Sequence, residues 1–195
     1  MLTERDINEV EDVVFDRITG KIRTRAHVRR AVVEAVLLAV LAIGGGLLSW
    51  GGSFARDMVH DQLAEQRISF PEKGSPALDA KTYPGLQQYA GQAVDNGPKA
   101  KAYANEYIKV HLKETNGGKT YSETSAESRA KPTDAVLAGK VQTLFRGETL
   151  RGLLLYAWGW SVVGHIATLT AYAAFLGAAV VLAALAYGLL RPQHA

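Results

Sequence analysis

The stretch from Gly164 to Leu190 constrains this chain more than any other. It reads GHIATLTAYAAFLGAAVVLAALAYGLL and contains no Asp, Glu, Lys or Arg. As a helix it would be roughly 40 Å long, which exceeds the ~30 Å hydrocarbon core of a bilayer. A charge-free run of this length predicts a transmembrane helix, so the rest of the chain has to be placed on one side of a membrane or the other.

A second apolar run lies near the N-terminus, at residues 31–50, AVVEAVLLAVLAIGGGLLSW. It is just long enough to span a bilayer, although it contains Glu34 and a glycine triplet. The small residues Ser53 and Ala55 could mark a signal-peptide cleavage site. However, about thirty residues precede the run, so we interpret it as an uncleaved anchor.

Charged residues at the ends of the two runs predict the orientation. Five basic residues and no acidic one lie within positions 21–30: Lys21, Arg23, Arg25, Arg29 and Arg30. By the positive-inside rule they predict a cytoplasmic N-terminus, and Arg191 predicts that residues 191–195 form a cytoplasmic tail. Residues 51–163 would then be extracytoplasmic. The bias is partial, because the outer segment also contains Arg56, Arg146 and Arg151.

Residues 1–30 are predicted to form an amphipathic helix followed by the basic flank. The helix would run from Thr3 to Thr19 and end at Gly20 as its C-cap. One face is apolar and the other acidic; the apolar positions are Ile7, Val10, Val14 and Ile18. The helix could bind a cytoplasmic partner protein or fold back on its own chain, and the sequence leaves both open.

The extracytoplasmic residues 51–163 are predicted to be helical, with helices near 51–66, 84–95, 98–115, 120–130 and 134–163. Pro84 and Pro98 suit first helical positions, and Thr120 with Glu123 has capping-box spacing. No alternating strand pattern of useful length occurs. We therefore expect an all-α membrane protein. Its two transmembrane helices would extend into an antiparallel hairpin outside the bilayer, with a small helical cap packed on the hairpin. A third span at 150–168 is disfavoured, because no turn residue separates it from the apolar residues 169–190.

Both predicted spans carry small residues along one side, which lets membrane helices approach closely. In the first span these are Ala35, Ala39, Ala42, Gly45 and Gly46, and in the second Gly164, Thr168, Ala171 and Ala178. The faces could pack the two spans of one chain together, or they could bind a larger complex or further copies of the chain.

Polar residues in and around the spans have two readings each. Glu34 follows Arg30 by four residues, so an ion pair at the membrane edge is the simpler interpretation, and an ion path or proton relay is the alternative. His165 could be a ligand for a metal or a quinone-like molecule, or a structural histidine. Basic and aromatic residues at the ends of the spans are predicted to anchor them in the interface: Arg29, Arg30, Trp50, Trp158, Trp160 and Arg191.

The sequence does not predict catalysis or nucleic-acid binding. It has no cysteine, which excludes disulfides and thiol chemistry, and its five histidines are scattered. Nucleotide-binding glycine fingerprints and hydrolase or metalloprotease motifs are missing. The net charge of +3 includes no basic block of the kind that binds nucleic acid. We therefore expect no cofactor, no metal and no catalytic residues.

Three segments, MVHDQLAEQRISFPEKGSPAL, YAGQAVDNGPKAKAYANEYI and VQTLFRGETLRGLLLYAWGW, resemble a group of uncharacterised actinobacterial integral membrane proteins. The resemblance covers about residues 30–190. It implies location in a bacterial plasma membrane and assigns no activity to any residue. Some members carry the label aromatic ring-opening dioxygenase, but this sequence lacks the clustered His and Glu residues that would bind iron.

Two hypotheses arise from the sequence. In the first, the chain is a non-enzymatic accessory or scaffold subunit whose partners are the lipid bilayer and other membrane proteins, bound through the small-residue faces and the outer cap. In the second, copies of the chain form a channel or sensor with the first span lining the axis.

Overall fold

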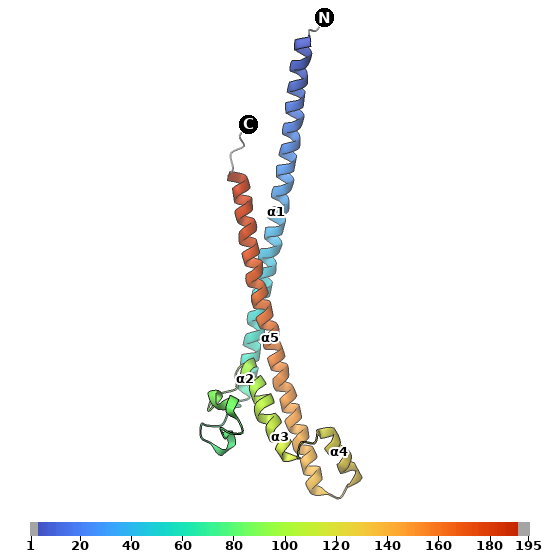
Figure 1. Ribbon diagram of the computed structural model, residues 1–195, viewed down its shortest axis with the longest axis vertical. Helices are drawn as coiled ribbons and strands as arrows, with labels where there is room; N and C mark the ends of the chain where they lie inside the picture. The colour runs from blue at the N-terminus through green and yellow to red at the C-terminus, as the bar shows by residue number, and fades with distance from the viewer. Residues whose placement is uncertain (1–3, 191–195) are drawn as a thin grey trace. The chain divides into compact units, whose positions relative to one another are not determined.

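The structure is a computed structural model that describes residues 4–190, with side chains described at residues 17, 25, 27–188 and 190. It is all-helical across this range, which confirms the predicted α class (Figure 1). No strand is present in the described range; the nearest feature is an isolated antiparallel bridge between Ser69 and Ala93.

The first helix, α1, is one unbroken element over Glu4–Glu65. The prediction of a separate helix that ends at Gly20 is therefore wrong. A glycine within a helix costs only about 1 kcal/mol relative to alanine, and the Lys- and Arg-rich residues after Gly20 favour helix. The side chains of the predicted amphipathic face lie outside the described ones. The helix ends where Arg67 adopts a positive φ of 51°.

The last helix, α5, covers Ala135–Leu190 without interruption. It passes through residues 150–168 with no turn, so these residues do not form a separate helix, in agreement with the sequence argument against a third span. The boundary expected at residue 164 is a change of composition and not a break in the helix.

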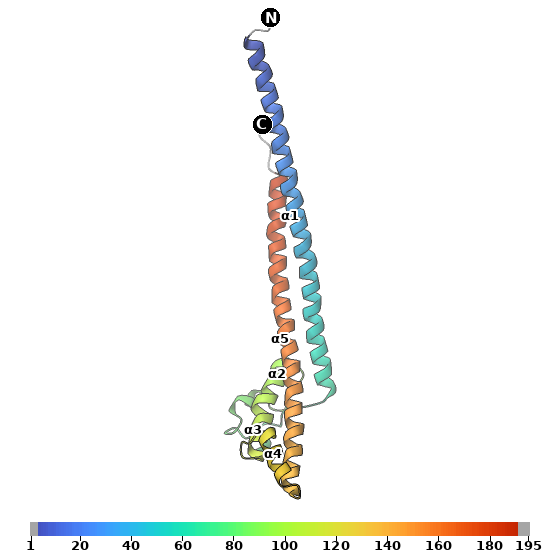
Figure 2. The same ribbon diagram turned by 90° about the vertical axis from the view of Figure 1, so that its right-hand side faces the viewer.

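Short helices connect α1 to α5. They are η1 (Pro76–Leu78), η2 (Pro84–Tyr89), α2 (Gly97–Ala102), η3 (Tyr103–Ile108), α3 (Lys109–Thr115) and α4 (Tyr121–Ala130). The capping box predicted at the start of α4 is present, with the Thr120 and Glu123 side chains each bonded to the other's backbone. In both views α2, α3 and α4 lie beside the N-terminal part of α5 (Figures 1 and 2).

Two of the predicted short helices differ from the structure. The α-helix expected at 84–95 is wrong, because η2 is a 3-10 helix that ends at Tyr89 and Gly91 then takes a φ of 70°. The chain next becomes extended, and Val94 N–H donates to Ile68 O at 2.8 Å. The helix expected at 98–115 forms as α2, η3 and α3 in succession, with a π-helical turn at η3.

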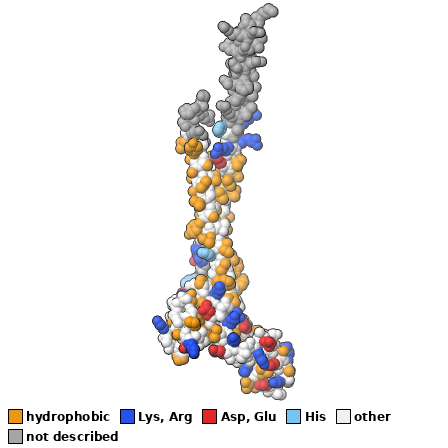
Figure 3. Space-filling view, in the orientation of Figure 1, with side chains coloured by type: hydrophobic (Ala, Val, Ile, Leu, Met, Phe, Trp, Pro, Cys, Tyr) orange, Lys and Arg blue, Asp and Glu red, His pale blue; other side chains and the backbone are white. Residues whose placement is uncertain are grey.

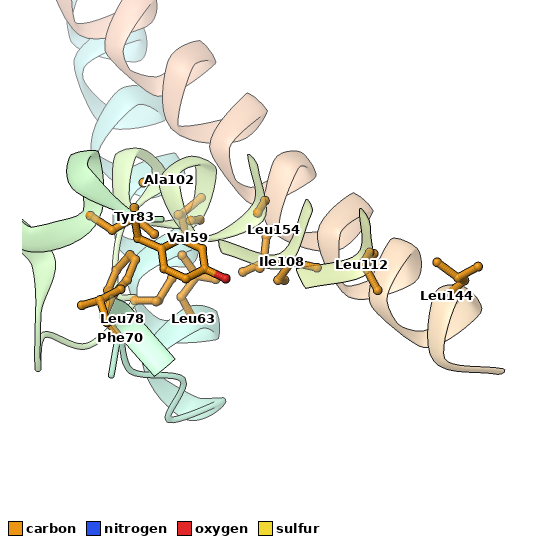
Figure 4. Packing of buried hydrophobic residues seen from close by; sticks show 14 residues of the cluster. Val59, Leu63, Phe70, Leu78, Tyr83, Ala102, Ile108, Leu112, Leu144 and Leu154 are labelled. Carbon is orange, nitrogen blue, oxygen red and sulfur yellow. The ribbon is translucent and has the colours of Figure 1, made fainter. Parts of the chain in front are cut away.

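The chain divides into two compact units, one of Met1–Ser49 with Leu169–Ala195 and the other of Trp50–Thr168. We call the second the cap unit. Its core joins side chains of the short helices to Val59 and Leu63 of α1 and to Leu144 and Leu154 of α5 (Figure 4). Apolar side chains from alanine to tyrosine fill this core, and Leu86 has no exposed surface.

The apolar residues where α1 and α5 extend beyond the predicted spans are only partly buried. Val59, Leu63 and Leu144 are in the core, but Phe54 and Phe145 are more than half exposed. The Phe145 ring lies 5.8 Å from that of Tyr121 at the start of α4. In this part of α5, Gly147 lies against Leu112 of α3. The C-terminal part of the cap unit is therefore built by α3 and α4 on α5, an arrangement that the sequence did not predict.

A row of aromatic rings lies at the centre of the cap unit. The Phe70 ring is 5.1 Å from that of Tyr103, which is 4.9 Å from that of Tyr107. Burial is the main cause that raises the pKa of the Tyr103 phenol above its usual value, with a smaller contribution from Tyr107. The Tyr103 phenol is therefore a neutral hydrogen-bonding group at neutral pH.

Candidate membrane-helix interface

Two helices of the described chain, α1 and α5, each contain a segment long and apolar enough to cross a membrane. Their large apolar side chains point mostly outward: Val33, Ile43, Leu47, Leu176 and Val180 are each more than 60% exposed. Figure 3 shows this hydrophobic surface on the visible side of both helices. Exposed apolar surface on this scale is typical of a surface that contacts a membrane or another protein.

In the unit of residues 1–49 and 169–195, α1 and α5 meet at small residues. Leu41 Cδ1 lies 3.4 Å from the position that a Cβ of Gly177 would occupy. The Phe175 ring covers Gly45, with Cε1 2.9 Å from the position of a Cβ there. Moving from Leu41 to Gly45 along α1, the contacted residue on α5 changes from Gly177 back to Phe175. The two helices are therefore antiparallel in this unit.

In the cap unit the same two helices approach through backbone. A Cβ on Gly52 would lie 2.9 Å from the carbonyl oxygen of Gly164 and 3.1 Å from the nitrogen of Thr168. A Cβ on Gly164 would lie 3.0 Å from that of Ala55. Both positions therefore require glycine, because the neighbouring atoms are backbone, the hydrogen-bonded Thr168 hydroxyl and the Ala55 methyl group, which cannot turn aside.

Arg56 connects the helices next to this contact. Its Nη1 donates to Thr168 Oγ1 at 3.1 Å, and its Nη2 donates to Ser53 Oγ at 3.2 Å. The Thr168 hydroxyl donates in turn to Gly164 O at 2.9 Å. The side chain of Arg56 thus lies along α1 towards its N-terminus, the direction that helix geometry favours.

The two small-residue faces predicted from the sequence differ in how far they are buried. On α5, Gly164, Ala171 and Ala178 are buried and Thr168 is half-buried. On α1 only Gly45 is buried, and the other small residues are exposed: Ala35, Ala39, Ala42 and Gly46. The small face of α5 is therefore used inside the chain, whereas most of the small face of α1 remains open.

The predicted ion pair at Glu34 is present. Arg30 Nε donates to Glu34 Oε1 at 2.7 Å, and the Glu34 side chain is 18% exposed. Arg29 is exposed beside it. Glu34 is thus neutralised by its own helix. Arg191, the remaining predicted basic anchor, lies outside the described residues.

The three tryptophans predicted as anchors differ from one another in exposure and in the residues they contact. Trp50 is 69% exposed and its ring stacks on that of Phe54. Trp160 is exposed and meets the Tyr156 ring edge to face, with centroids 6.3 Å apart. Trp158 is half-buried, with Lys101 Nζ 4.4 Å from its ring centroid. Trp50 and Trp160 are thus free to contact an interface, whereas Trp158 faces the cap.

Three residues of this interface were missed by the sequence argument: Gly52, Phe175 and Arg56. Gly52 lies just beyond the end of the predicted first span, in a Gly-Gly pair that could have signalled a close approach. Phe175 and Arg56 carry no such signal, because their role depends on which face of each helix meets the other.

Comparisons of this chain with protein-family models, with curated proteins and with solved structures find no match. Over the part of the chain that the structure describes, no three His, Asp or Glu side chains are grouped so that they could hold a metal ion.

Proposed function

We propose that this chain is a non-enzymatic subunit of a membrane complex, anchored by α1 and α5 and bound to other membrane proteins through the open small face of α1. Both termini would lie in the cytoplasm, with residues 51–163 outside as an antiparallel hairpin and its cap. The bilayer would be a bacterial plasma membrane.

The lengths of the apolar segments support the anchoring. Between Glu34 and Arg56, α1 has no charged residue over roughly 32 Å at ~1.5 Å per residue. This length matches the ~30 Å hydrocarbon core. The exposed Arg25, Arg29 and Arg30 precede it, which suits the cytoplasmic side.

One observation carries the partner role: the open small face of α1, made of Ala35, Ala39, Ala42 and Gly46. In lipid, burial of large apolar side chains gives no gain over contact with lipid tails, so helices associate where small residues let backbones approach. The corresponding face of α5 is already occupied within the chain. The face of α1 therefore has room for a further helix.

The test is the mass and composition of the particle extracted from native membranes with a gentle detergent. We expect a stoichiometric co-purifying membrane protein that is lost from an Ala39→Leu, Ala42→Leu double variant. Ala179→Leu, an exposed small position on α5, is the matched control and should keep the partner. Recovery of monomer alone from the wild-type chain would refute the proposal.

The open face of α1 also favours a second candidate, a homo-oligomeric channel or sensor with α1 lining the axis. Its polar group would be Glu34, which is already paired with Arg30. This candidate predicts a conductance in reconstituted vesicles that Glu34→Gln alters. A particle sealed to ions, with or without that substitution, would eliminate it.

A further inference from the structure

A second exposed apolar face lies on α5 within the cap unit. Its members are Leu153, Tyr156, Trp160 and Val163, with exposed fractions of 60%, 67%, 39% and 53%. Their spacing of three or four residues places them on one side of the helix. Gly152 and Gly159 flank them, and a Cβ at either glycine would meet nothing within 4 Å.

The charge-free segment of α5 is much longer than that of α1. It extends from Gly152 to Leu190, roughly 58 Å at ~1.5 Å per residue, against roughly 32 Å for α1. One bilayer thickness cannot match both lengths. Tilting the two helices to immerse all of α5 would draw Arg56 and the adjacent Asp57 into lipid, which is strongly unfavourable.

Polar groups of the cap unit mark where this part of α5 meets water. Gly97 lies against Trp158 and Ser161 of α5. Close to Gly97 in sequence, Lys99 Nζ and Asp95 Oδ1 form an ion pair at 3.1 Å, and His60 Nδ1 lies 3.0 Å from Asp95 O. Charged and polar groups beside this part of α5 indicate an aqueous environment.

Charged groups also lie beyond the far end of the face. Arg151 Nη1 lies 3.1 Å from Glu148 Oε2, and Arg151 Nη2 donates to Asn105 Oδ1 at 3.1 Å. Leu153 and Tyr156 therefore lie between two groups of polar side chains, one around Asp95 and one around Arg151. The headgroup layer of one leaflet, about 5–8 Å thick, can cover Val163 and Trp160 but does not extend to Leu153.

We infer that this face of α5 is a contact between two copies of the chain outside the hydrocarbon layer. Chains inserted in the same orientation hold the face at the same height, so a twofold contact aligns it with itself. Such a contact needs protrusions and recesses on one surface. The paired rings of Tyr156 and Trp160 supply the first, and the open Gly152 and Gly159 supply the second.

Charge and size favour a copy over a different partner. The face contains no charged residue that would select an oppositely charged protein, and the nearest cation, Arg151, is neutralised by Glu148. With ~150–250 Å² for a whole aromatic side chain, the exposed parts of Tyr156 and Trp160 would bury on the order of 400 Å² over two copies. This is below the ~1,200 Å² of stable soluble complexes, which suits two chains already confined to one membrane.

Cysteine cross-linking tests this contact directly, because the chain has no cysteine of its own. Leu153→Cys, Tyr156→Cys and Trp160→Cys are each made singly and oxidised in native membranes. We expect at least one to yield a species of twice the chain mass. Val136→Cys is the control, since Val136 is 73% exposed on α5 outside the face and should stay monomeric. Adding Tyr156→Arg should lower the cross-linked fraction of Leu153→Cys about tenfold.

The inference rests on the proposal that α1 and α5 cross the bilayer, but not on the proposed use of the α1 face. Ala39→Cys reports on that face separately, so each proposal can fail alone. If none of the three cysteines cross-links, or if the product contains a different protein, the twofold contact is refuted.

Discussion

The two compact units of this chain bury different kinds of side chain. In the unit of residues 1–49 and 169–195, every buried residue among the described ones is small: Gly45, Ala171 and Ala178. In the cap unit the fully buried side chains include Leu78, Leu86, Leu144 and Leu154. One chain thus uses two ways of packing helices.

The proposed placement of the first unit in lipid and of the cap unit in water would account for this difference. In water, burial of a leucine side chain contributes about 1.5–3 kcal/mol, so large residues collect in the core. In lipid that gain is missing, and contacts between small residues and backbone hold helices together. Gly52 and Gly164 are the exception within the cap unit, since α1 and α5 also approach through small residues there, beside Arg56.

The largest expected effect is in the cap core. Leu86→Ala removes a side chain with no exposed surface, and we expect a loss of about 2–5 kcal/mol in the free energy of unfolding. Val136→Ala, at a position 73% exposed, should change it by less than about 0.5 kcal/mol. Thermal unfolding of the detergent-solubilised chain measures both. Equal effects would mean that the cap is not packed as a water-type core.

Gly52 tests the backbone contact between the helices. Gly52→Ala places a methyl group against the Gly164 carbonyl and the Thr168 nitrogen, so we expect a loss of about 1–3 kcal/mol. Gly51→Ala is the matched control, because a Cβ there meets nothing within 4 Å. It should stabilise the helix by about 0.5–1 kcal/mol through the lower entropy of the unfolded chain. Neighbouring glycines would then respond with opposite signs, and two stabilising substitutions would contradict the close approach.

The sequence was sufficient for the α class, for the two apolar segments, for the Arg30–Glu34 pair and for the cap of α4. Each of these depends on residues close together in the chain. It did not predict that α1 continues through Gly20, because a single glycine is a weak signal against a long run of helix-forming neighbours. Nor did it predict the extended backbone at Ala93, which requires a partner at Ser69 far away in sequence.

Only part of the candidate interface could be predicted, because the rest also depends on contacts between residues far apart in the chain. The small residues of α5 were recognised by spacing, and three of the four are buried. On α1 the same argument grouped Gly45 with Ala35, Ala39 and Ala42, although the structure buries only Gly45. A helix that is apolar all round has no polar face to show its orientation, so periodicity cannot tell which small residues face the partner helix.

A smaller effect is expected at Gly45, in the other unit. A Cβ there would meet only the far edge of the Phe175 ring, and a ring can rotate away. We therefore expect Gly45→Ala to change stability by less than about 1 kcal/mol, with the strain offset by the gain in helix propensity. Gly44→Ala, where no atom lies within 4 Å, should be stabilising. A loss at Gly45 as large as at Gly52 would show that the two units pack their helices in the same way.

The smallest effect is a pH dependence of α4, which depends on its cap and not on either kind of core. The Thr120 backbone N–H and hydroxyl donate to the Glu123 carboxylate at 2.7 and 2.8 Å, and these bonds lower the pKa of Glu123 below its usual value. Because the folded pKa is the lower one, the stabilisation is complete above the unfolded pKa and is lost as the pH falls through the folded value. Hydrogen exchange of residues 121–130, corrected for its intrinsic rate, should therefore show α4 opening as the pH falls below about 4.3, the ordinary pKa of a glutamate side chain. Glu127 has a lowered pKa as well, through its bond with Lys119, so the comparison is with Glu123→Gln. That variant should show weaker protection at neutral pH and a smaller change on acidification, and an unchanged profile would mean that the cap does not hold α4.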